Sequence, residues 1–401
     1  PCARIRWLMN GTSLRRRNPR NGGSRVLKAL PDPYRDMIRP AAIVLPAREG
    51  FSAGAVGAIG GQVAALAVPG DVVVGAPLTA ASLLPRHDYR PVRPGLWPPG
   101  GRSVRYAAAV MRVVRDLGTD VIEVHNRPDI ARYIARHCPR HRVLLVLHND
   151  PQGMRGADTP ALRADLLRRM TVACVSDWLR GRFVDGMPAH HAARVLLSPN
   201  GAALPATVPP MAERAQCVLF AGRVVADKGA DLFVAACAEL RRSHPGWRFD
   251  MIGADRFRVD APATPFLTDL APRADAAGVE MTGYRPHAAV LSAMAQASIV
   301  VVPSRWPEPF GLTALEAMAA GAALVVAPTG GLPEVVGDGG VLCAPDPPAG
   351  LARAIASLMD DLPARQALAV RGRARAARFS IERAVALRQA ARLAALHHGA
   401  G

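Results

Sequence analysis

One short segment of this sequence combines the side chains that proteins use to bind phosphate. Arg223, Lys228 and Gly229 follow an apolar run, Cys217–Ala221, that predicts a strand. One arginine can bind two phosphate oxygens at once, lysine supplies a compact positive charge, and glycine lets the backbone approach the ligand. The segment predicts a diphosphate-binding loop, with a solvated turn as the alternative.

Two carboxylates follow a second predicted strand, Ile299–Val302. Glu308 lies in a proline-rich loop, and Glu316 lies about one turn into a helix expected to begin near residue 312. Carboxylates on two sides of a ligand can accept hydrogen bonds from a vicinal diol, although Glu316 could instead complement its helix dipole. The N–H groups at the start of this helix are predicted to bind phosphate oxygens. They belong to Phe310, Gly311 and Leu312.

A glycine turn, Gly330-Gly331, follows a third predicted strand, Ala323–Ala327. Ligands of open parallel sheets bind beyond the carboxyl ends of the strands. Because all three loops follow strands, we expect them at one edge of one sheet. Together they indicate a site for a sugar joined to a diphosphate.

The first half of the chain offers weaker candidates. His125 and His148 each end a predicted strand, where a structural and a functional role are equally consistent with the pattern. Gly54 and Gly57 lie in a loop that could cradle a substrate. No G-x-G-x-x-G motif precedes an acidic residue at dinucleotide spacing, which disfavours a nicotinamide enzyme.

Short apolar strands alternate with helices in both halves, which predicts right-handed β-α-β units and parallel sheets. The first stretch is basic and rich in turns, and Met37 is a candidate natural start. We expect five parts: a basic flexible segment (1–38), a first Rossmann-like domain (39–201), a linker (202–210), a second Rossmann-like domain (211–375) and a C-terminal helix (376–401).

The net charge of +18 comes almost entirely from dispersed arginines. The plain interpretation is a basic solvated surface, and the functional one is attraction to an anionic membrane or a phosphorylated substrate. Nucleic acid is disfavoured because no aromatic stacking platform accompanies the basic residues. The uncharged segment 51–70 is rich in glycine and alanine, so we expect a loop and a buried helix there rather than a membrane span.

The six cysteines are scattered, with no C-x-x-C pair and no histidine at ligand spacing. They predict a reducing compartment and no structural metal. With no convincing signal peptide, we expect a cytoplasmic protein, soluble or peripheral at the inner face of the cell membrane.

A set of motifs between residues 216 and 345 resembles the donor half of glycosyltransferase family 4. The first half resembles a bacterial surface-polysaccharide branch of that family more loosely, through its Phe51–Ile59 loop and His125–Pro128. Ser198–Gly201 resembles the family's Pro-Asn-Gly turn. The donor-half motifs are Arg223 to Gly229, Pro303-Ser304, the E-x7-E pair of Glu308 and Glu316, Glu316–Gly321, and Gly330–Val336.

The resemblance implies a GT-B fold, an α/β architecture of two facing Rossmann-like domains with the last helix returning to the first. The first domain would bind the acceptor and the second the nucleotide sugar. It further implies a retaining hexosyltransferase of cell-surface polysaccharide biosynthesis that has no obligatory metal or cofactor. The donor would be a UDP-, GDP- or ADP-sugar, and the acceptor a saccharide or a lipid-linked saccharide.

The resemblance also implies roles for single residues. Arg223 and Lys228 would neutralise the leaving diphosphate, Glu316 would hold the ribose hydroxyls, and Glu308 would contact hydroxyls of the donor sugar. His125 would face the transferred sugar from the other domain. No dedicated base is assigned, because the leaving phosphate can accept the proton of the acceptor.

Two other functions stay open at this point. A sugar-nucleotide epimerase of the same fold would need acid and base residues around the sugar in both domains. A non-catalytic basic protein would bind a membrane or an anionic polymer through its arginines alone.

Overall fold

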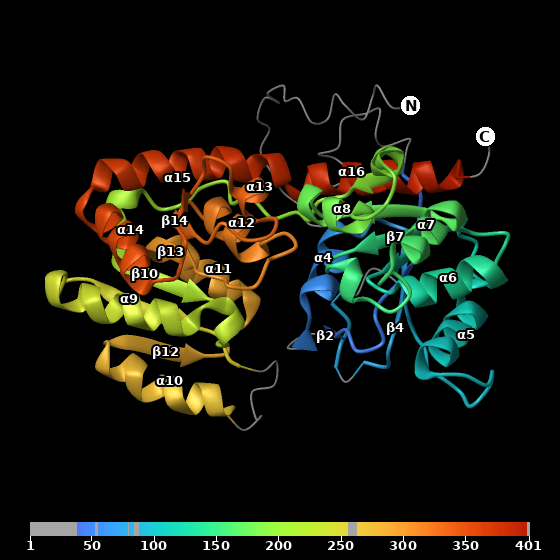
Figure 1. Ribbon diagram of the computed structural model, residues 1–401, viewed down its shortest axis with the longest axis horizontal. Coiled ribbons are helices and arrows are strands. Elements are labelled where there is room, and N and C mark those ends of the chain that lie inside the picture. Colours follow the sequence, from blue (N-terminus) through green and yellow to red (C-terminus); the bar gives the residue numbers. More distant parts are fainter. Residues whose placement is uncertain (1–37, 53–54, 79, 84–87, 256–262, 399–401) are drawn as a thin grey trace. The chain divides into compact units, whose positions relative to one another are not determined.

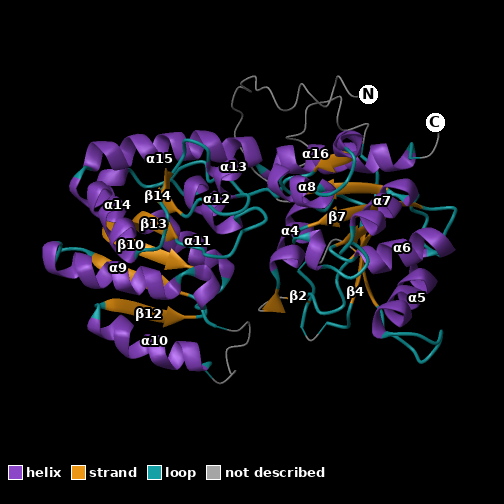
Figure 2. Ribbon diagram, viewed as in Figure 1, coloured by secondary structure: helices purple, strands orange, loops and turns teal. Residues whose placement is uncertain are grey.

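The computed structural model describes residues 38–52, 55–78, 80–83, 88–255 and 263–398 (Figure 1). The predicted N-terminal segment, Met37 and Gly54 lie outside these residues. The chain divides into two compact units, the first running to Gly201 and resuming at Ile381, the second spanning Ala202–Ser380. Each unit combines helices with a parallel sheet (Figure 2).

The first unit is built on seven strands in the order β5-β4-β1-β6-β7-β8-β9, all parallel. Residues 144–147 in its centre are fully buried, as expected for a parallel sheet covered on both faces. The strands are β1 (Ala41–Val44), β4 (Val72–Gly75), β5 (Asp88–Pro91), β6 (Val121–His125), β7 (Arg142–Leu147), β8 (Thr171–Cys174) and β9 (Val195–Leu197). The helices are α4 (Ala58–Leu66), α5 (Arg102–Val114), α6 (Pro128–His137), α7 (Pro160–Arg169), α8 (Asp177–Val184) and α16 (Ile381–Leu396).

The last helix, α16, belongs to the first unit although the second unit precedes it in the chain. It packs against β6, β7, β8 and α4. Its small apolar residues Ala391 and Ala395 enter the core beside Leu144 and Val146. The expected return of the final helix to the first domain is therefore confirmed.

The second unit has six parallel strands in the order β12-β11-β10-β13-β14-β15. Val218 and Phe220 of β10 pack with Phe233 of α9 and Ile355 of α14 in its core. The strands are β10 (Ala215–Ala221), β11 (Arg248–Ile252), β12 (Val279–Gly283), β13 (Ala297–Val302), β14 (Ala323–Val326) and β15 (Val341–Leu342). The helices are α9 (Ala230–Ser243), α10 (Pro265–Ala276), α11 (His287–Gln296), α12 (Leu312–Ala319), α13 (Leu332–Val336), α14 (Pro348–Asp360) and α15 (Leu362–Ala376).

Several elements have no counterpart in the sequence prediction: strand β5, helices α10 and α13, and a small hairpin of β2 (Phe51–Ser52) with β3 (Ala55–Val56). Strand β5 is a polar strand at the sheet edge, so it carries no apolar run. Helix α10 contains Pro272, which obscures its helical pattern.

The stretch expected to be a linker, 202–210, clusters with the second unit. Arg373 Nη2 donates to the carbonyl oxygen of Pro205 at 2.9 Å, and Arg214 Nε donates to that of Pro209 at 3.1 Å. Residues 376–380, placed with the final helix in the sequence prediction, also belong to the second unit. None of the described helices is both long and apolar enough to cross a membrane.

Candidate active site

The order of strands in the second unit reverses between β10 and β13. From β10 the chain builds outward through β11 and β12, and it then returns to add β13 on the other side of β10. Loops diverge at such a switch point, so this edge of an open sheet is where ligands bind. The loop after β10 carries Lys228 and the loop after β13 carries Glu308.

Lys228 and Glu308 meet at this edge, as an ion pair between Lys228 Nζ and Glu308 Oε1. The hydroxyl of the buried Ser304 also donates to Glu308 Oε1, at 2.9 Å. The Lys228 and Glu308 side chains are 25% and 13% exposed. The ion pair and the Ser304 hydrogen bond therefore fix the positions of Lys228 and Glu308, and both side chains remain accessible to a ligand.

Two glycines let the three loops interlock. Gly229 has φ +71°, and a Cβ there would lie 2.0 Å from the carbonyl oxygen of Pro303. Gly330 has φ +61°, and a Cβ there would lie 2.3 Å from the carbonyl oxygen of Glu308. In both positions the conformation and the space require glycine. The loops after β10 and β14 thus fix the backbone of the loop after β13 that carries Glu308.

Helix α12 begins beside the loop that carries Glu308, and no side chain caps its N-terminal turn. Its N-cap residue Gly311 has φ +93° and offers no side chain to the first N–H groups of the helix. Such a turn carries a partial positive charge and suits phosphate oxygens. The Phe310 side chain is buried and meets the ring of Phe379 edge-on, with centroids 5.6 Å apart. Phe310 can therefore offer a ligand its backbone but not its ring.

Glu316, in the second turn of α12, hydrogen-bonds to His287 at the start of α11. His287 Nε2 lies 2.8 Å from Glu316 Oε1. This hydrogen bond raises the pKa of His287, and partial burial of the ring opposes the effect. Among the described residues, Glu316 Oε2 accepts no hydrogen bond. This oxygen can accept one from a ligand hydroxyl.

Arg223 lies on the same loop as Lys228, two residues after the end of β10, and is exposed. Gly222 before it packs closely against Gly253, the residue after β11, because a Cβ on Gly253 would lie 1.7 Å from the Gly222 carbonyl oxygen. The structure thus brings Lys228 and Glu308 into contact and places Arg223 and Glu316 on elements of the same sheet edge.

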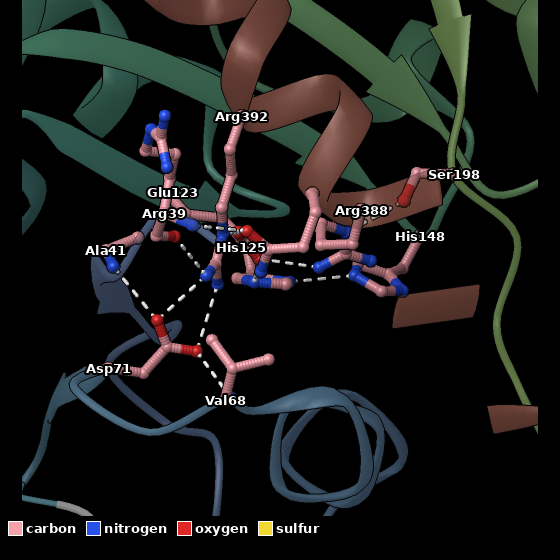
Figure 3. Close-up of polar contacts among 11 residues, drawn as sticks. Arg39, Ala41, Val68, Asp71, Glu123, His125, His148, Ser198, Arg388 and Arg392 are labelled. Carbon is pink, nitrogen blue, oxygen red and sulfur yellow. Dashed lines mark hydrogen bonds and ion pairs between the residues drawn. The ribbon is translucent and has the colours of Figure 1, made fainter. Parts of the chain in front are cut away.

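His125, in the first unit, lies in a buried polar network at the end of β6 (Figure 3). Its Nε2 is 2.8 Å from Glu123 Oε1, and its Nδ1 is 2.9 Å from Nε2 of His148. The His125 side chain is fully buried. The expectation that His125 faces a sugar therefore differs from the structure, because both ring nitrogens are already bonded inside the unit.

Two arginines of α16, near the C-terminal end of the sequence, donate hydrogen bonds to this network. Arg388 Nη1 donates to Glu123 Oε1 at 2.5 Å, and Arg392 Nε donates to Glu123 Oε2 at 2.7 Å. Arg392 also pairs with Asp71, whose carboxylate accepts from the backbone N–H of Ala41 and Val68 (Figure 3). The two carboxylates and the two guanidinium groups balance in charge.

Burial and neighbouring charges keep the two histidines neutral. Burial opposes ionisation of Glu123, but Arg392 and Arg388 outweigh it and hold the pKa of Glu123 well below its usual range. Burial lowers the pKa of His125 against the opposing effect of Glu123. Burial, the His125 ring and Arg388 lower the pKa of His148 strongly. With Glu123 ionised, His125 Nε2–H donates to it, and His148 Nε2–H donates to His125 Nδ1.

His148 is the outer end of this chain of hydrogen bonds, with 8% of the residue exposed. Asn126, with φ +55°, fixes its loop, because Asn126 Oδ1 accepts from the backbone N–H of His148 and of Asn149, both at 3.1 Å. Among the described residues, no hydrogen bond involves Nδ1 of His148. His148, and not His125, has a ring nitrogen left for a ligand.

Gly57 also has a different role from the one expected. The carboxylate of Glu49 occupies the start of α4, where its Oε1 accepts from the N–H of Gly60 at 2.8 Å. A Cβ on Gly57 would lie 2.1 Å from that same oxygen. Burial raises the pKa of Glu49, and the backbone hydrogen bonds oppose this. Gly57 therefore makes room for an internal carboxylate at the position proposed for a substrate.

The sequence prediction gave no role to several residues around the two sites. Ser304 was named only as part of the Pro303-Ser304 motif, two residues after a strand end, and His287 only as the first residue of a predicted helix. Glu123 interrupts an otherwise apolar strand, and Arg388 and Arg392 lie four residues apart on one helix face. A charge within an apolar run was the signal for the buried network. Among the described residues, no group of three or more histidine, cysteine, aspartate or glutamate side chains could hold a metal ion.

Comparison with known families finds a match within the second unit. Residues 208–375 match the family described as glycosyl transferases group 1. Glycogen synthase of Mycobacterium tuberculosis is 40% identical over 164 residues, which cover 40% of this chain and 37% of that protein. The lipopolysaccharide core biosynthesis mannosyltransferase LpsB of Rhizobium meliloti is 34% identical over 168 residues, 40% of this chain and 46% of that protein. These matches span less than half the length of each relative.

Solved structures extend the similarity to both units. Anabaena Alr3699/HepE in complex with UDP and glucose matches with a TM-score of 0.67 at 20% identity, covering 86% of this chain and 96% of that one. Sucrose-phosphate synthase from Thermosynechococcus elongatus matches with a TM-score of 0.69 at 22% identity, covering 91% and 100%. The chain therefore has the GT-B fold, with a glycosyl transferases group 1 region in its second unit.

Proposed function

We propose that this protein is a retaining glycosyltransferase that moves a hexose from a nucleotide-diphosphate sugar to a saccharide or lipid-linked acceptor. The observation that carries the proposal is the Lys228–Glu308 pair at the switch point of the second sheet, beside the uncapped start of α12. Names of relatives such as glycogen synthase and the mannosyltransferase LpsB support a sugar-transfer reaction. The complex of HepE with UDP-glucose supports a nucleotide-sugar donor.

Each residue of the cluster then has a chemical task. Lys228 and Arg223 bind the diphosphate, together with the N–H groups at the start of α12. Glu316 Oε2 accepts from a ribose hydroxyl, and Glu308 accepts from hydroxyls of the donor sugar. As the bond from the anomeric carbon to phosphate breaks, fixed positive charges stabilise the charge on the leaving diphosphate. The acceptor hydroxyl bonds to the anomeric carbon, and its proton passes to the leaving phosphate.

In the first unit we propose His148, in place of His125, as the imidazole available to a bound saccharide. It is the outer end of the hydrogen-bond chain from Glu123 through His125, with 8% of the residue exposed. Its lowered pKa keeps it neutral, so Nδ1 accepts a hydrogen bond from a sugar hydroxyl. We also propose a place in cell-surface polysaccharide biosynthesis, which the family resemblance and the name of the mannosyltransferase relative support, and a peripheral position at the membrane.

The test is an assay of UDP-, GDP- and ADP-sugars with saccharide and lipid-linked acceptors, with the anomeric configuration of the product read by NMR. We expect one donor class to give a product that retains the donor's configuration. Isomerisation of the donor without an acceptor would favour the epimerase instead. Binding to acidic polymers with no turnover of any donor would favour the non-catalytic binding protein.

A further inference from the structure

The loop between β5 and α5 exposes two adjacent large apolar side chains. Leu96 is 91% exposed and Trp97 is 75% exposed, the highest values among the large hydrophobic residues that the structure describes. Single exposed apolar residues are ordinary, whereas adjacent ones indicate a surface that meets something apolar.

The same region is strongly basic. From Tyr89 to Arg115 the sequence contains no aspartate or glutamate. A Cβ on Gly95 would lie 4.0 Å from Nη2 of Arg112, and one on Gly101 would lie 3.9 Å from Nη1 of Arg155, so arginines of other segments border this loop. The segment carries six arginines: Arg90, Arg93, Arg102, Arg105, Arg112 and Arg115.

The ends of this loop are anchored while its tip stays outside. The N–H of the buried Val92 donates to the carbonyl oxygen of Gly75 at 2.8 Å, and the N–H of Val104 donates to that of Gly101 at 3.0 Å. Pro94, Pro98 and Pro99 limit the conformations of the tip. The apolar pair thus lies on an exposed tip between two hydrogen-bonded ends.

We propose that residues 92–101, here named the docking loop, bind the surface of an anionic lipid bilayer, an inference that rests on the peripheral membrane position proposed above. Leu96 and Trp97 enter the boundary between headgroups and acyl chains, where tryptophan is enriched in membrane proteins. Arg93, Arg102 and Arg112 face the headgroup phosphates, because arginines near an anionic membrane are attracted to it. A soluble polyanion would engage the arginines but would leave the apolar pair in water.

Cosedimentation with vesicles tests this proposal on the full chain. Vesicles of phosphatidylcholine alone are compared with vesicles that also contain phosphatidylglycerol, for the wild type and for the double variant Leu96→Ser, Trp97→Ser. The control is Leu342→Ser, Val370→Ser, which removes two exposed apolar side chains of the second unit, 44% and 70% exposed. Thermal unfolding of each variant checks that it is folded.

We expect the wild type and the control to bind the anionic vesicles alike, and the docking-loop variant to lose at least about tenfold in affinity. Arg93→Gln with Arg102→Gln should weaken binding by about fivefold per arginine, and added salt should weaken it further. Trp97 fluorescence, isolated by difference from Trp97→Ser, should shift to the blue on binding. Equal binding by the docking-loop variant, or retention only by soluble dextran sulfate, would overturn the proposal. Donor turnover without an acceptor membrane is measured separately, so failure here leaves the transferase proposal untouched.

Discussion

The two units place their charged side chains in opposite settings. In the second unit, Lys228 and Glu308 meet at a sheet edge where a ligand can compete for them. In the first unit, Glu123, Arg388 and Arg392 are nearly inaccessible and bond to one another. An accessible pair costs little to rearrange, whereas a buried pair leaves an uncompensated charge when one partner is lost. We infer that the first cluster holds the fold together and the second performs the chemistry.

The largest effect should come from breaking the buried network. Glu123→Gln leaves Arg388 and Arg392 short of a negative charge in the core, so we expect the first unit to lose about 3–5 kcal/mol of stability. Urea unfolding measures this loss. The control Asp269→Asn removes the exposed partner of Arg273 and should change nothing measurable. Equal stability of Glu123→Gln and wild type would mean that the network is not structural.

The next effect should be catalytic. Glu308→Gln keeps the shape of the side chain but removes the charge that pairs with Lys228 and that we propose binds sugar hydroxyls. We expect kcat/KM to fall by roughly 10²–10³, the scale for losing one electrostatic group of an active site. The melting temperature should stay unchanged. Glu280→Gln, at an exposed position on β12, is the matched control. Full activity in Glu308→Gln would reverse the roles assigned to the two clusters.

The smallest effect should be a dependence of stability on pH. His125 and His148 have folded pKa values below the unfolded value, so unfolding takes up protons as the pH falls below about 6.5. Stability present at neutral pH should decrease toward pH 5, by up to about 2 kcal/mol for each histidine. Protonation of Glu123 causes a further loss of stability as the pH falls below about 4.5, because its folded pKa is lowered. His287, whose pKa is raised, acts oppositely, losing its contribution as the pH rises through its folded value.

Unfolding titrations at pH 5 and pH 7 check this slope in wild type and in His148→Gln. The variant should show a shallower dependence of stability on pH, because position 148 no longer carries an imidazole that takes up a proton on unfolding. A slope that is unchanged by His148→Gln would show that His148 is not the source of the pH dependence.

Local patterns were enough to predict the second-unit cluster. Apolar runs locate the strands, and the polar residues just after parallel strands must share an edge. The sequence alone therefore predicted that Lys228 and Glu308 lie close together. The contacts of Gly229 and Gly330 could not, because they depend on how closely two loops pack. Strand β5 and helix α10 were missed because one is polar and the other is interrupted by proline.

The first-unit network could not be predicted from the sequence, for a different reason. Glu123 and Arg388 are separated by 265 residues, and nothing local indicates that they meet. Arginines in an arginine-rich chain were read as solvated, whereas Arg388 and Arg392 are buried. The family resemblance implied that His125 would face a sugar, whereas its ring nitrogens are hydrogen-bonded to Glu123 and His148.

The most direct test of the division between the two clusters is calorimetric titration of wild type, Lys228→Ala and Arg273→Ala with UDP, GDP and ADP. We predict that one nucleotide binds the wild type and Arg273→Ala equally. Lys228→Ala should bind it about 30-fold more weakly, the equivalent of roughly 2 kcal/mol for a lost charge-assisted contact. Equal binding of that nucleotide by all three proteins would contradict the assignment of the diphosphate to the Lys228–Glu308 edge.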